Sequence, residues 1–398
     1  MQNYHPTLFI EINDLEYFFA VGVRNENNHF ELLYKDAVPN LGISNYKISD
    51  FDLIQDTIKK NIYLIEQKLN FTFKDVILIL NVFHCSFINL TGYKKLNGSQ
   101  ILKENITYIL NSLKSTIDDL EVKKKILHIF NSKYCLDNEK IENLPIGLFG
   151  NFYSHELSFS LIYKNDYKNL NNIFNKCNLK IKKILLKNFV EGTYLINKNE
   201  NLNTFFKIEI NENSSKLFYF ENYALKFSQN FNFGSNLILS DISKVTSLKK
   251  DKVNKILSNN ILTRSISDND FIEEELFDNE NYRKIKKKLI FEIAEARIQE
   301  LSEIILIKNI NLISFNKKNE RVILSLNDKS NMKCFEECYR LNFSNENYFK
   351  IKFIENTKSE DLLDNADQLV NFGWKKEAIP VIHSKKSLLA KFFNALFN

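Results

Sequence analysis

The segment Thr7–Val23, TLFIEINDLEYFFAVGV, places two apolar stretches on either side of a short polar turn. Two such stretches around a turn predict a pair of strands, and Glu31–Lys35 predicts a third strand. Asp50–Leu69 has apolar residues at helical spacing and predicts a helix, while Asp75–Leu80 (DVILIL) predicts a short buried strand. The order strand, strand, helix and buried strand is typical of an α/β protein.

A similar order recurs in the second half of the chain. Thr204–Ile210 and Lys216–Tyr219 predict a strand pair around a polar turn, and Ala224–Phe231 predicts a third strand. A long predicted helix at Tyr282–Lys308 and a predicted strand at Arg321–Leu326 follow. Two halves that each open with a strand pair indicate an internally duplicated α/β fold, of the kind that actin, hexokinase and the chaperone ATPases share. A generic two-domain α/β arrangement is the alternative.

Glycine and proline are scarce in this chain. The 398 residues include 9 glycines and 4 prolines, where average usage predicts about 28 and about 20. No two glycines form a Gly-x-Gly, and none is followed by Lys-Ser or Lys-Thr. Phosphate-binding loops need glycine where the backbone approaches the ligand. The composition therefore argues against ordinary nucleotide-binding loops, and the shortage of turn residues argues against an all-β fold.

Other features exclude further classes of function. The net charge of +5 is too small to indicate a nucleic-acid partner. Cys334 and Cys338 lie four residues apart without the further ligands of a zinc site, so we expect no metal site and reduced cysteines. Neighbouring residues on a strand point to opposite faces, so His84 and Cys85 are not a nucleophile pair. We expect a cytosolic protein, because no signal peptide and no run of 18 apolar residues is visible.

The segment His128–Gly150, HIFNSKYCLDNEKIENLPIGLFG, resembles a stretch of FtsA, the actin-like bacterial cell-division protein. Ala296–Leu301 (ARIQEL) is similar to a helix of the same family, with alanine where the family has proline. The resemblance covers almost the whole chain and includes the C-terminal tail, which other actin-like relatives such as the pilus-assembly protein PilM do not share. Within His128–Gly150, the positions that match the FtsA pattern at the same spacing are His128, Tyr134, Leu136, Asp137, Pro145, Ile146, Gly147 and Gly150.

The resemblance implies a fold and a division of the chain. The fold is a duplicated actin-like, ribonuclease H-like α/β fold of two domains, with an inserted α+β subdomain and a C-terminal amphipathic helix. Residues 1–81 and 161–191 form the first actin-like subdomain, 82–160 the inserted subdomain, 192–244 and 309–375 the second actin-like subdomain, 245–308 a helical partner-binding subdomain, 376–384 a linker, and 385–398 the helix.

The two phosphate-binding turns of the family, DIGTTK and DIGGGTTD, have degenerate counterparts here. They fall on Glu11–Glu16 (EINDLE) and Glu209–Lys216 (EINENSSK), where glycines give way to larger residues and a lysine replaces the metal-side acid. A triphosphate needs uncovered backbone N–H groups and a cation. We therefore expect no bound cofactor: ATP with magnesium is implied only by the resemblance. Alternatively, a weak site survives, because Asn and Ser tolerate unusual backbone angles. The degenerate positions are Glu11, Asn13, Glu209, Asn211, Ser214, Ser215 and Gly234.

The tail at residues 385–398 predicts an amphipathic membrane-binding helix. Its apolar residues recur on one helical face, lysines border that face, and no acid interrupts it. Burial of each Leu or Phe contributes about 1.5–3 kcal/mol, and each lysine near an anionic leaflet contributes about 1 kcal/mol. The alternative is a terminal helix that packs on the core of the protein. The predicted membrane-binding residues are Lys385, Lys386, Leu388, Leu389, Lys391, Phe392, Phe393, Leu396 and Phe397.

A basic cluster precedes and includes the ARIQEL segment. In FtsA the corresponding helix lies in the subdomain that receives the acidic C-terminal peptide of FtsZ, the tubulin-like ring protein. Basic side chains suit an acidic peptide through charge attraction and hydrogen bonds. The alternative is a solvated helix face. The predicted partner-binding residues are Arg283, Lys284, Lys287, Lys288 and Arg297.

These expectations combine into a non-catalytic function. The resemblance implies an adaptor that ties the FtsZ ring to the cytoplasmic face of the inner membrane at the division site. Its partners would be the FtsZ peptide, the lipid surface, further copies of itself and other division proteins, and not nucleic acid. The alternative is an actin-like ATP-binding protein or ATPase with a weak but working nucleotide site.

Overall fold

The structure is a computed structural model, and it describes residues 5–44, 46–199, 201–259, 262, 265–277, 281–315, 320–327, 335–345 and 349–380. Two compact units make up the chain. Unit 1 contains Met1–Asn203, Phe220–Phe227 and Thr357–Asn398, and unit 2 contains Thr204–Tyr219 and Ser228–Asn356. None of the helices in the described ranges combines the length and apolarity needed to cross a lipid bilayer.

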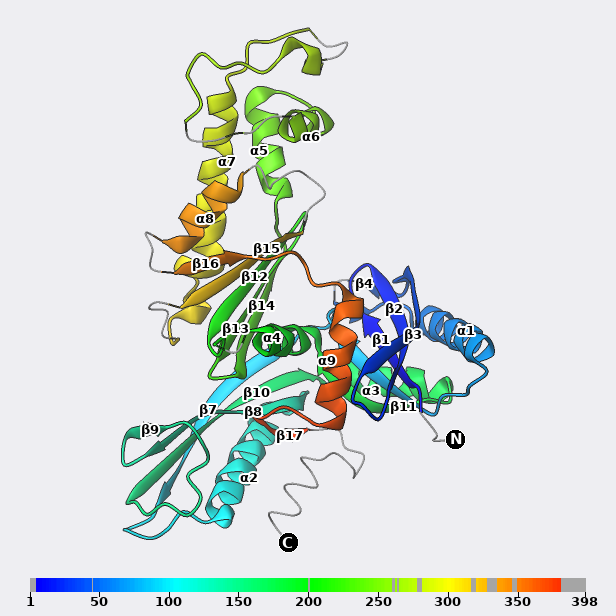
Figure 1. Cartoon of the computed structure of the whole chain (residues 1–398), viewed down its shortest axis with the longest axis vertical. Coiled ribbons are helices and arrows are strands. Elements are labelled where there is room, and N and C mark those ends of the chain that lie inside the picture. The colour runs from blue at the N-terminus through cyan, green and yellow to red at the C-terminus, as the bar shows by residue number, and fades with distance from the viewer. Residues whose placement is uncertain are drawn as a thin grey trace. The chain divides into compact units, whose positions relative to one another are not determined.

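Unit 1 is built on a five-stranded sheet that contains, in spatial order, β11 (Lys180–Leu186), β6 (Asp75–Leu80), β1 (Thr7–Ile12), β2 (Glu16–Arg24) and β3 (Phe30–Pro39) (Figure 1). The strands β1, β2 and β3 pair antiparallel, and β6 and β11 add to the other edge of β1 as parallel strands. The strand pair and the buried strand predicted from the first half of the sequence are therefore confirmed.

Three helices accompany this sheet: α1 (Phe51–Leu69), α3 (Lys164–Lys176) and α4 (Lys187–Lys198). The side chain of Asp50 caps α1 by accepting a hydrogen bond from the amide of Leu53, as expected for an acidic residue at a helix start. The apolar spacing predicted one buried face, and that face consists of Ile54, Ile58, Ile62 and Ile65. A short hairpin of β4 (Ile43–Ser44) and β5 (Lys47–Ile48) precedes α1.

A second five-stranded sheet, most of which lies in unit 2, repeats the strand order of the first. Its strands lie in the spatial order β14 (Ala224–Phe231), β13 (Ser215–Glu221), β12 (Phe205–Asn211), β15 (Arg321–Asn327) and β16 (Lys350–Phe353). In both sheets the strands follow the order third, second, first, fourth and fifth along the chain, and the fourth and fifth run parallel to the first. Two sheets of this ribonuclease H-like order confirm the predicted duplicated actin-like fold.

The helices of unit 2 follow β14 along the chain. They include α5 (Asn236–Thr246), α6 (Lys250–Asn259), α7 (Lys287–Ser302), which continues as a π-helical turn at Glu303–Ile307, and α8 (Glu336–Ser344). The long helix predicted from Tyr282 begins five residues later. The residues just before Lys287 are extended and pair with an earlier segment of the chain. The amide of Ile272 donates to the carbonyl of Ile285, and Lys286 forms a β-bridge with Phe271.

A second sheet of unit 1 contains the segment inserted between β6 and β11. It consists of β7 (Ser86–Lys95), β8 (Lys124–Leu136), β9 (Glu139–Ile141) and β10 (Phe152–Tyr163), with α2 (Lys103–Leu120) packed against it. The buried residues of α2, among them Ile109 and Leu110, contribute to its core.

The C-terminal part of the described chain differs from the prediction. The resemblance predicts residues up to 375 in the second subdomain and a linker at 376–384, whereas α9 (Ser359–Asn371) and β17 (Glu377–Pro380) belong to unit 1. Asp367 of α9 pairs with Arg24 of β2, and β17 adds to the inserted sheet as an antiparallel partner of β8. These contacts join segments more than 200 residues apart, so local sequence patterns could not show them.

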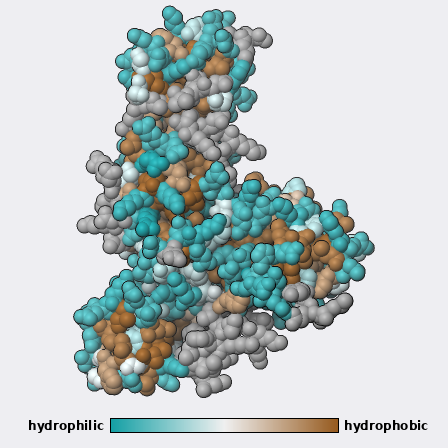
Figure 2. Space-filling view, viewed as in Figure 1, coloured by the Kyte–Doolittle hydropathy of each residue, from teal (hydrophilic) through white to brown (hydrophobic). Residues whose placement is uncertain are grey.

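An exposed apolar patch marks the end of the inserted sheet that carries β9. Figure 2 shows apolar side chains gathered at this end of the molecule. The patch includes Phe149, which is 71% exposed, and the stacked rings of Tyr93 and Phe152. Leu148 and Ile146 are also exposed. Contiguous exposed apolar side chains are typical of interaction surfaces.

Candidate functional site

The first degenerate phosphate turn connects β1 to β2 in unit 1. Glu11, near the end of β1, is only 2% exposed. The ammonium of Lys187, the first residue of α4, lies 2.6 Å from its Oε1, and also donates to the hydroxyl of Ser359. The side-chain NH₂ of Asn13 donates a longer hydrogen bond of 3.4 Å to the same Oε1. The charge of this carboxylate is thus balanced within the protein.

The backbone donors of this turn are also occupied. The side-chain oxygen of Asn13 accepts hydrogen bonds from the amides of Leu15 and Glu16, each at 2.9 Å. This is the local Asx-turn geometry for which asparagine is favoured. Two N–H groups that a phosphate turn would direct at its ligand therefore bind a side chain of the turn itself.

The second degenerate turn connects β12 to β13 in unit 2. The amide of Asn211 donates to the carbonyl of Ser214, which closes the turn at 2.8 Å. The amides of Ser235 and Asn236 donate to the carbonyls of Asn211 and Glu212, each at 2.9 Å. A side-chain bond of 2.7 Å from Asn236 to Asn213 adds to these contacts. The turn and the loop 233–236 are consequently fastened to one another.

Ser215 and Gly234, two further positions of the degenerate site, also contribute to the contact between the turn and the loop 233–236. Ser215 is fully buried, and its hydroxyl donates to the carbonyl of Phe233 at 2.8 Å. A Cβ added to Gly234 would lie 2.0 Å from the carbonyl oxygen of Asn211 and 2.8 Å from that of Glu212. Glycine is therefore required at 234 by the close approach of two backbone segments. Glu209 lies half-buried in β12.

The described residues of these turns do not fit a triphosphate. A phosphate chain needs N–H donors that are free and a positive environment. Here the donors named above are bonded within the protein, and Glu16 and Glu212 add like charge that repels a phosphate. Lys216, where the family has the metal-side acid, is 7% exposed. No chemical step through a nucleotide follows from this arrangement.

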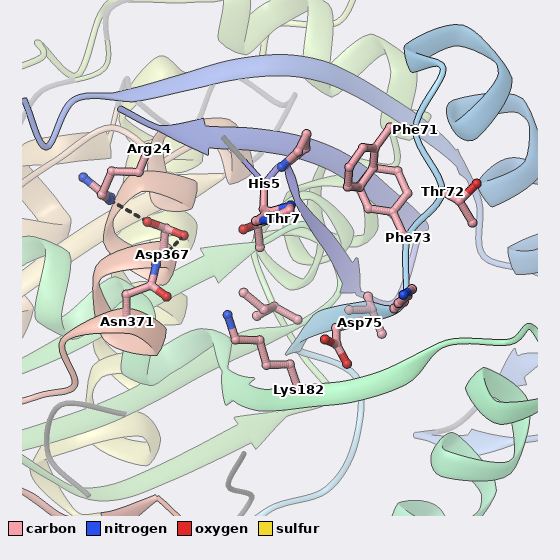
Figure 3. A pocket seen from close by; sticks show the side chains of 14 residues that line it. His5, Thr7, Arg24, Phe71, Thr72, Phe73, Asp75, Lys182, Asp367 and Asn371 are labelled. Carbon is pink, nitrogen blue, oxygen red and sulfur yellow. Dashed lines mark hydrogen bonds and ion pairs between the residues drawn. The ribbon is translucent and has the colours of Figure 1, made fainter. Parts of the chain in front are cut away.

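A cavity of about 590 Å³ lies at the opposite edge of the first sheet, where β1 and β6 begin (Figure 3). Phe71, Phe73 and Lys182 are among its lining residues. On one wall, Arg24 and Asp367 form an ion pair of 2.6 Å. Ligands of α/β sheets usually bind at the carboxyl ends of the strands, and this cavity lies at the amino ends, so sequence reasoning did not point to it.

The predicted basic cluster of unit 2 is largely used within the unit. Arg283 donates to the carbonyls of Thr246 and Ser247 at the end of α5. The other internal partners are Glu273 for Lys287, Asp268 for Lys288 at 2.9 Å, and Asp241 for Arg297 at 2.5 Å. The side chain of Lys284 is exposed and makes no recorded ion pair within the described residues. The cluster therefore offers a partner fewer uncompensated charges than its sequence implies.

The predicted membrane-binding residues of the tail, Lys385 to Phe397, lie outside the described residues. The described part of the chain stops at Pro380, which pairs with His128 in the inserted sheet. The amphipathic helix therefore remains a prediction from the sequence.

Comparisons with known proteins agree with the architecture. The chain is 21% identical over 400 residues to cell division protein FtsA of Buchnera aphidicola subsp. Acyrthosiphon pisum, and 98% of this chain and 94% of that protein are covered. FtsA of Neisseria meningitidis serogroup B is 18% identical over 299 residues, with 75% and 72% covered. A chain of the PilM-PilN type IV pilus biogenesis complex has a TM-score of 0.51 at 9% identity over 92% of this chain and 96% of its own, which shows the fold alone. No protein-family model matches the chain.

Proposed function

We propose that this chain, which is a divergent relative of the FtsA cell-division proteins, is a non-catalytic adaptor that ties the FtsZ ring to the cytoplasmic face of the inner membrane at the division site. The observation that carries the proposal is the internal bonding of both phosphate turns: Asn13 binds the amides of Leu15 and Glu16 in the first turn, and the loop 233–236 donates to the carbonyls of Asn211 and Glu212 in the second. A chain that keeps the duplicated fold but closes these turns retains the scaffold of an actin-like protein without its nucleotide chemistry.

The proposal predicts that ATP does not bind with useful affinity. In an equilibrium titration with labelled ATP and Mg²⁺, we expect no saturation at micromolar concentrations, since the turn donors are occupied. We also expect no thermal stabilisation by millimolar Mg·ATP, whereas a ligand at 100 times its Kd would add about 2.7 kcal/mol to the free energy of unfolding. Matched titrations with Mg²⁺ alone correct for effects of the cation. Micromolar affinity would instead support the alternative, an actin-like ATP-binding protein.

The membrane anchor of the adaptor would be the amphipathic tail. Its apolar face and bordering lysines combine hydrophobic insertion with attraction to anionic lipid. A single short helix binds reversibly, because much of the gain is offset by the cost of ordering it. Copies that associate in rows would bind firmly through avidity. The exposed patch around Phe149 supports self-association, since it offers apolar surface at the end of the inserted sheet.

The receptor for the acidic FtsZ peptide would lie in the helical part of unit 2. Lys284 and Lys286 are exposed, and neither forms an ion pair with another described residue. Lys287, Lys288 and Arg297 are already paired with acids, so exchanging those pairs for an acidic peptide would gain less. We therefore expect Lys284 and Lys286 to contribute most of the attraction.

Vesicle sedimentation tests the adaptor. We expect purified FtsZ to sediment with anionic vesicles only when this chain is present. Truncation after Pro380 should reduce sedimentation of both proteins at least tenfold. The variant Lys284→Glu/Lys286→Glu should reduce recruitment of FtsZ about three- to tenfold and leave vesicle binding of the chain itself unchanged. Lys350→Glu/Lys352→Glu, exposed on β16 in the same unit, is the charge-matched control. FtsZ that stays in the supernatant with the full chain would overturn the tethering function.

A further inference from the structure

A second cavity of unit 1, of about 730 Å³, lies at one end of the inserted sheet. Three segments that are distant in sequence surround it: the β4–β5 hairpin, the turn between α2 and β8, and the first turns of α3. The amide of Lys164 donates to the carbonyl of Lys123 at 2.8 Å, which holds two of these segments together. The cavity is therefore a built feature of the fold.

Lysine is the most frequent residue type in the described lining of this cavity. All three segments contribute lysines to it: Lys47, Lys123, Lys164 and Lys168. We call the cavity that these four residues line the lysine pocket. None of the four forms an ion pair within the described part of the chain. Asp166 is the single acid among the described lining residues. Burial raises its pKa, and the nearby charge of Lys47 opposes that rise. The acids Asp118 and Asp119, in the last turn of α2, are not among the lining residues.

Exposed apolar side chains accompany the lysine pocket. Leu120, the last residue of α2, is 73% exposed, and Val122 in the following turn is 64% exposed. Tyr163, the last residue of β10, is 41% exposed. A basic pocket beside exposed apolar side chains has the composition of a surface that contacts anionic lipid: lysines near the phosphates and apolar groups at the acyl boundary.

The described chain runs toward this end of the sheet before it stops at Pro380. β17 runs antiparallel to β8, and its last residue, Pro380, is paired with His128. β17 therefore heads toward Lys124, the first residue of β8, which lies four residues, or about 13 Å, from His128 along the strand. Lys385, where the basic tail begins, follows Pro380 by five residues, which can span at most about 18 Å.

We infer that the lysine pocket is a second membrane contact, which binds the phosphate-bearing headgroups of anionic lipids beside the root of the tail. The inference rests on the proposed membrane tether and adds to it a surface of the folded body. A single contact fixes one point of the body on the bilayer, whereas two contacts on one side also fix its orientation. Two tethered contacts also bind more firmly than either alone, because the second forms at high effective concentration.

Vesicle binding by charge variants tests the inference. The full chain is mixed with phosphatidylcholine vesicles that contain about 30% phosphatidylglycerol, so that anionic headgroups are abundant. We expect Lys47→Gln/Lys123→Gln/Lys164→Gln/Lys168→Gln to weaken partitioning about tenfold or more. The control, Lys244→Gln/Lys249→Gln/Lys250→Gln/Lys352→Gln, removes the same charge from exposed positions of unit 2 and should change it less than about threefold. Equal losses in both variants would overturn the inference.

A fluorescent reporter locates the contact directly. The chain has one tryptophan, Trp374, which is 6% exposed, so Val122→Trp introduces a second emitter at the lysine pocket. We expect its emission to shift to the blue on anionic vesicles and to be quenched by brominated lipid. The matched control is Val245→Trp, at a position of unit 2 that is 59% exposed, and its emission should not shift. Unchanged emission from position 122 in vesicle-bound protein would overturn the inference.

Truncation of the tail and competition by phosphate distinguish a failure of the second contact from a failure of the proposed anchor. If truncation after Pro380 abolishes vesicle binding while the lysine-pocket variant binds as the parent does, the tether stands and the second contact falls. If truncation leaves binding unchanged, the proposed anchor falls. Inorganic phosphate, compared with chloride at equal ionic strength, should not compete with the vesicles. Specific competition by millimolar phosphate would mark the pocket as a site for a soluble anion and overturn its assignment to lipid.

Discussion

Replacement of Glu377 by glutamine is expected to lower the free energy of unfolding of unit 1 by about 3–5 kcal/mol, the range for removing one partner of a buried ion pair. Glu377 of β17 is buried between the ammonium of Lys183 and the imidazole of His128. Its Oε1 lies 2.8 Å from Nδ1 of His128, and its Oε2 lies 3.1 Å from Nζ of Lys183. Glutamine keeps the shape of the side chain but leaves the Lys183 charge buried without its counter-ion.

The same group gives a dependence on pH. Burial alone would raise the pKa of Glu377, but the charges and hydrogen bonds of Lys183 and His128 lower it from 4.5 to about 2. Because the folded pKa lies below the unfolded one, this stabilisation is fully present above about pH 4.5 and is lost as the pH falls toward 2. A shift of this size corresponds to about 3 kcal/mol. The parent should therefore lose more stability than E377Q between pH 5 and pH 3.

Thermal and urea unfolding monitored by circular dichroism would measure this effect. The control is Glu360→Gln, which removes the solvent-screened pair of Glu360 with Lys35 and should change the stability far less than E377Q does. If E377Q does not fold, Lys183→Met/Glu377→Leu removes both charges and should recover most of the loss. Equal stability of E377Q and E360Q would contradict the structural role of the buried cluster.

Replacement of Gly234 by alanine is the second change with a large expected effect, a loss of about 3 kcal/mol or more from unit 2. The added methyl would overlap the backbone carbonyl of Asn211, which lies 2.0 Å from the ideal Cβ position. Relief of this overlap requires the loop 233–236 to move away from the turn of Asn211 and Glu212. That movement breaks the bonds donated by Ser235 and Asn236, and large single-residue effects arise from such combined strain and lost bonding.

The matched control is Gly98→Ala in unit 1. Gly98 has a φ of +80°, but no heavy atom lies within 4 Å of its added Cβ. Only the backbone conformation opposes this substitution, so we expect a loss of about 1 kcal/mol. Urea unfolding of both variants gives the comparison. A G234A protein as stable as G98A would show that the turn and the loop do not pack as closely as described.

Local sequence patterns predicted most elements that are stabilised by local bonding or by one clear apolar face. The strand Asp75–Leu80 lies where its unbroken apolar run placed it, and the helix Phe51–Leu69 begins after the predicted acidic cap, Asp50. The predictions were weaker where ends depend on neighbours. The helix expected from Tyr282 begins at Lys287, because the preceding residues pair with the chain near Phe271 and Ile272.

The candidate site divides in the same way. The loss of glycines from both phosphate turns is visible in the sequence, and it predicted side chains where a nucleotide would need open backbone. The sequence could not show that Asn13 binds the amides of its own turn, or that Lys187 neutralises Glu11 across 176 positions of the chain. Nor could it show that most of the basic cluster near Arg297 is already paired with acids.

The sequence by itself determined the duplicated α/β pattern, the worn phosphate turns and the amphipathic character of the tail, because each depends on residue spacing within a short segment. Only the tertiary structure decided that β17 joins the inserted sheet, that Glu377 lies between His128 and Lys183, and that lysines from three segments surround one cavity. These features arise from pairing and packing between distant segments. Their formation depends on the chain's overall topology, which no local window of residues contains.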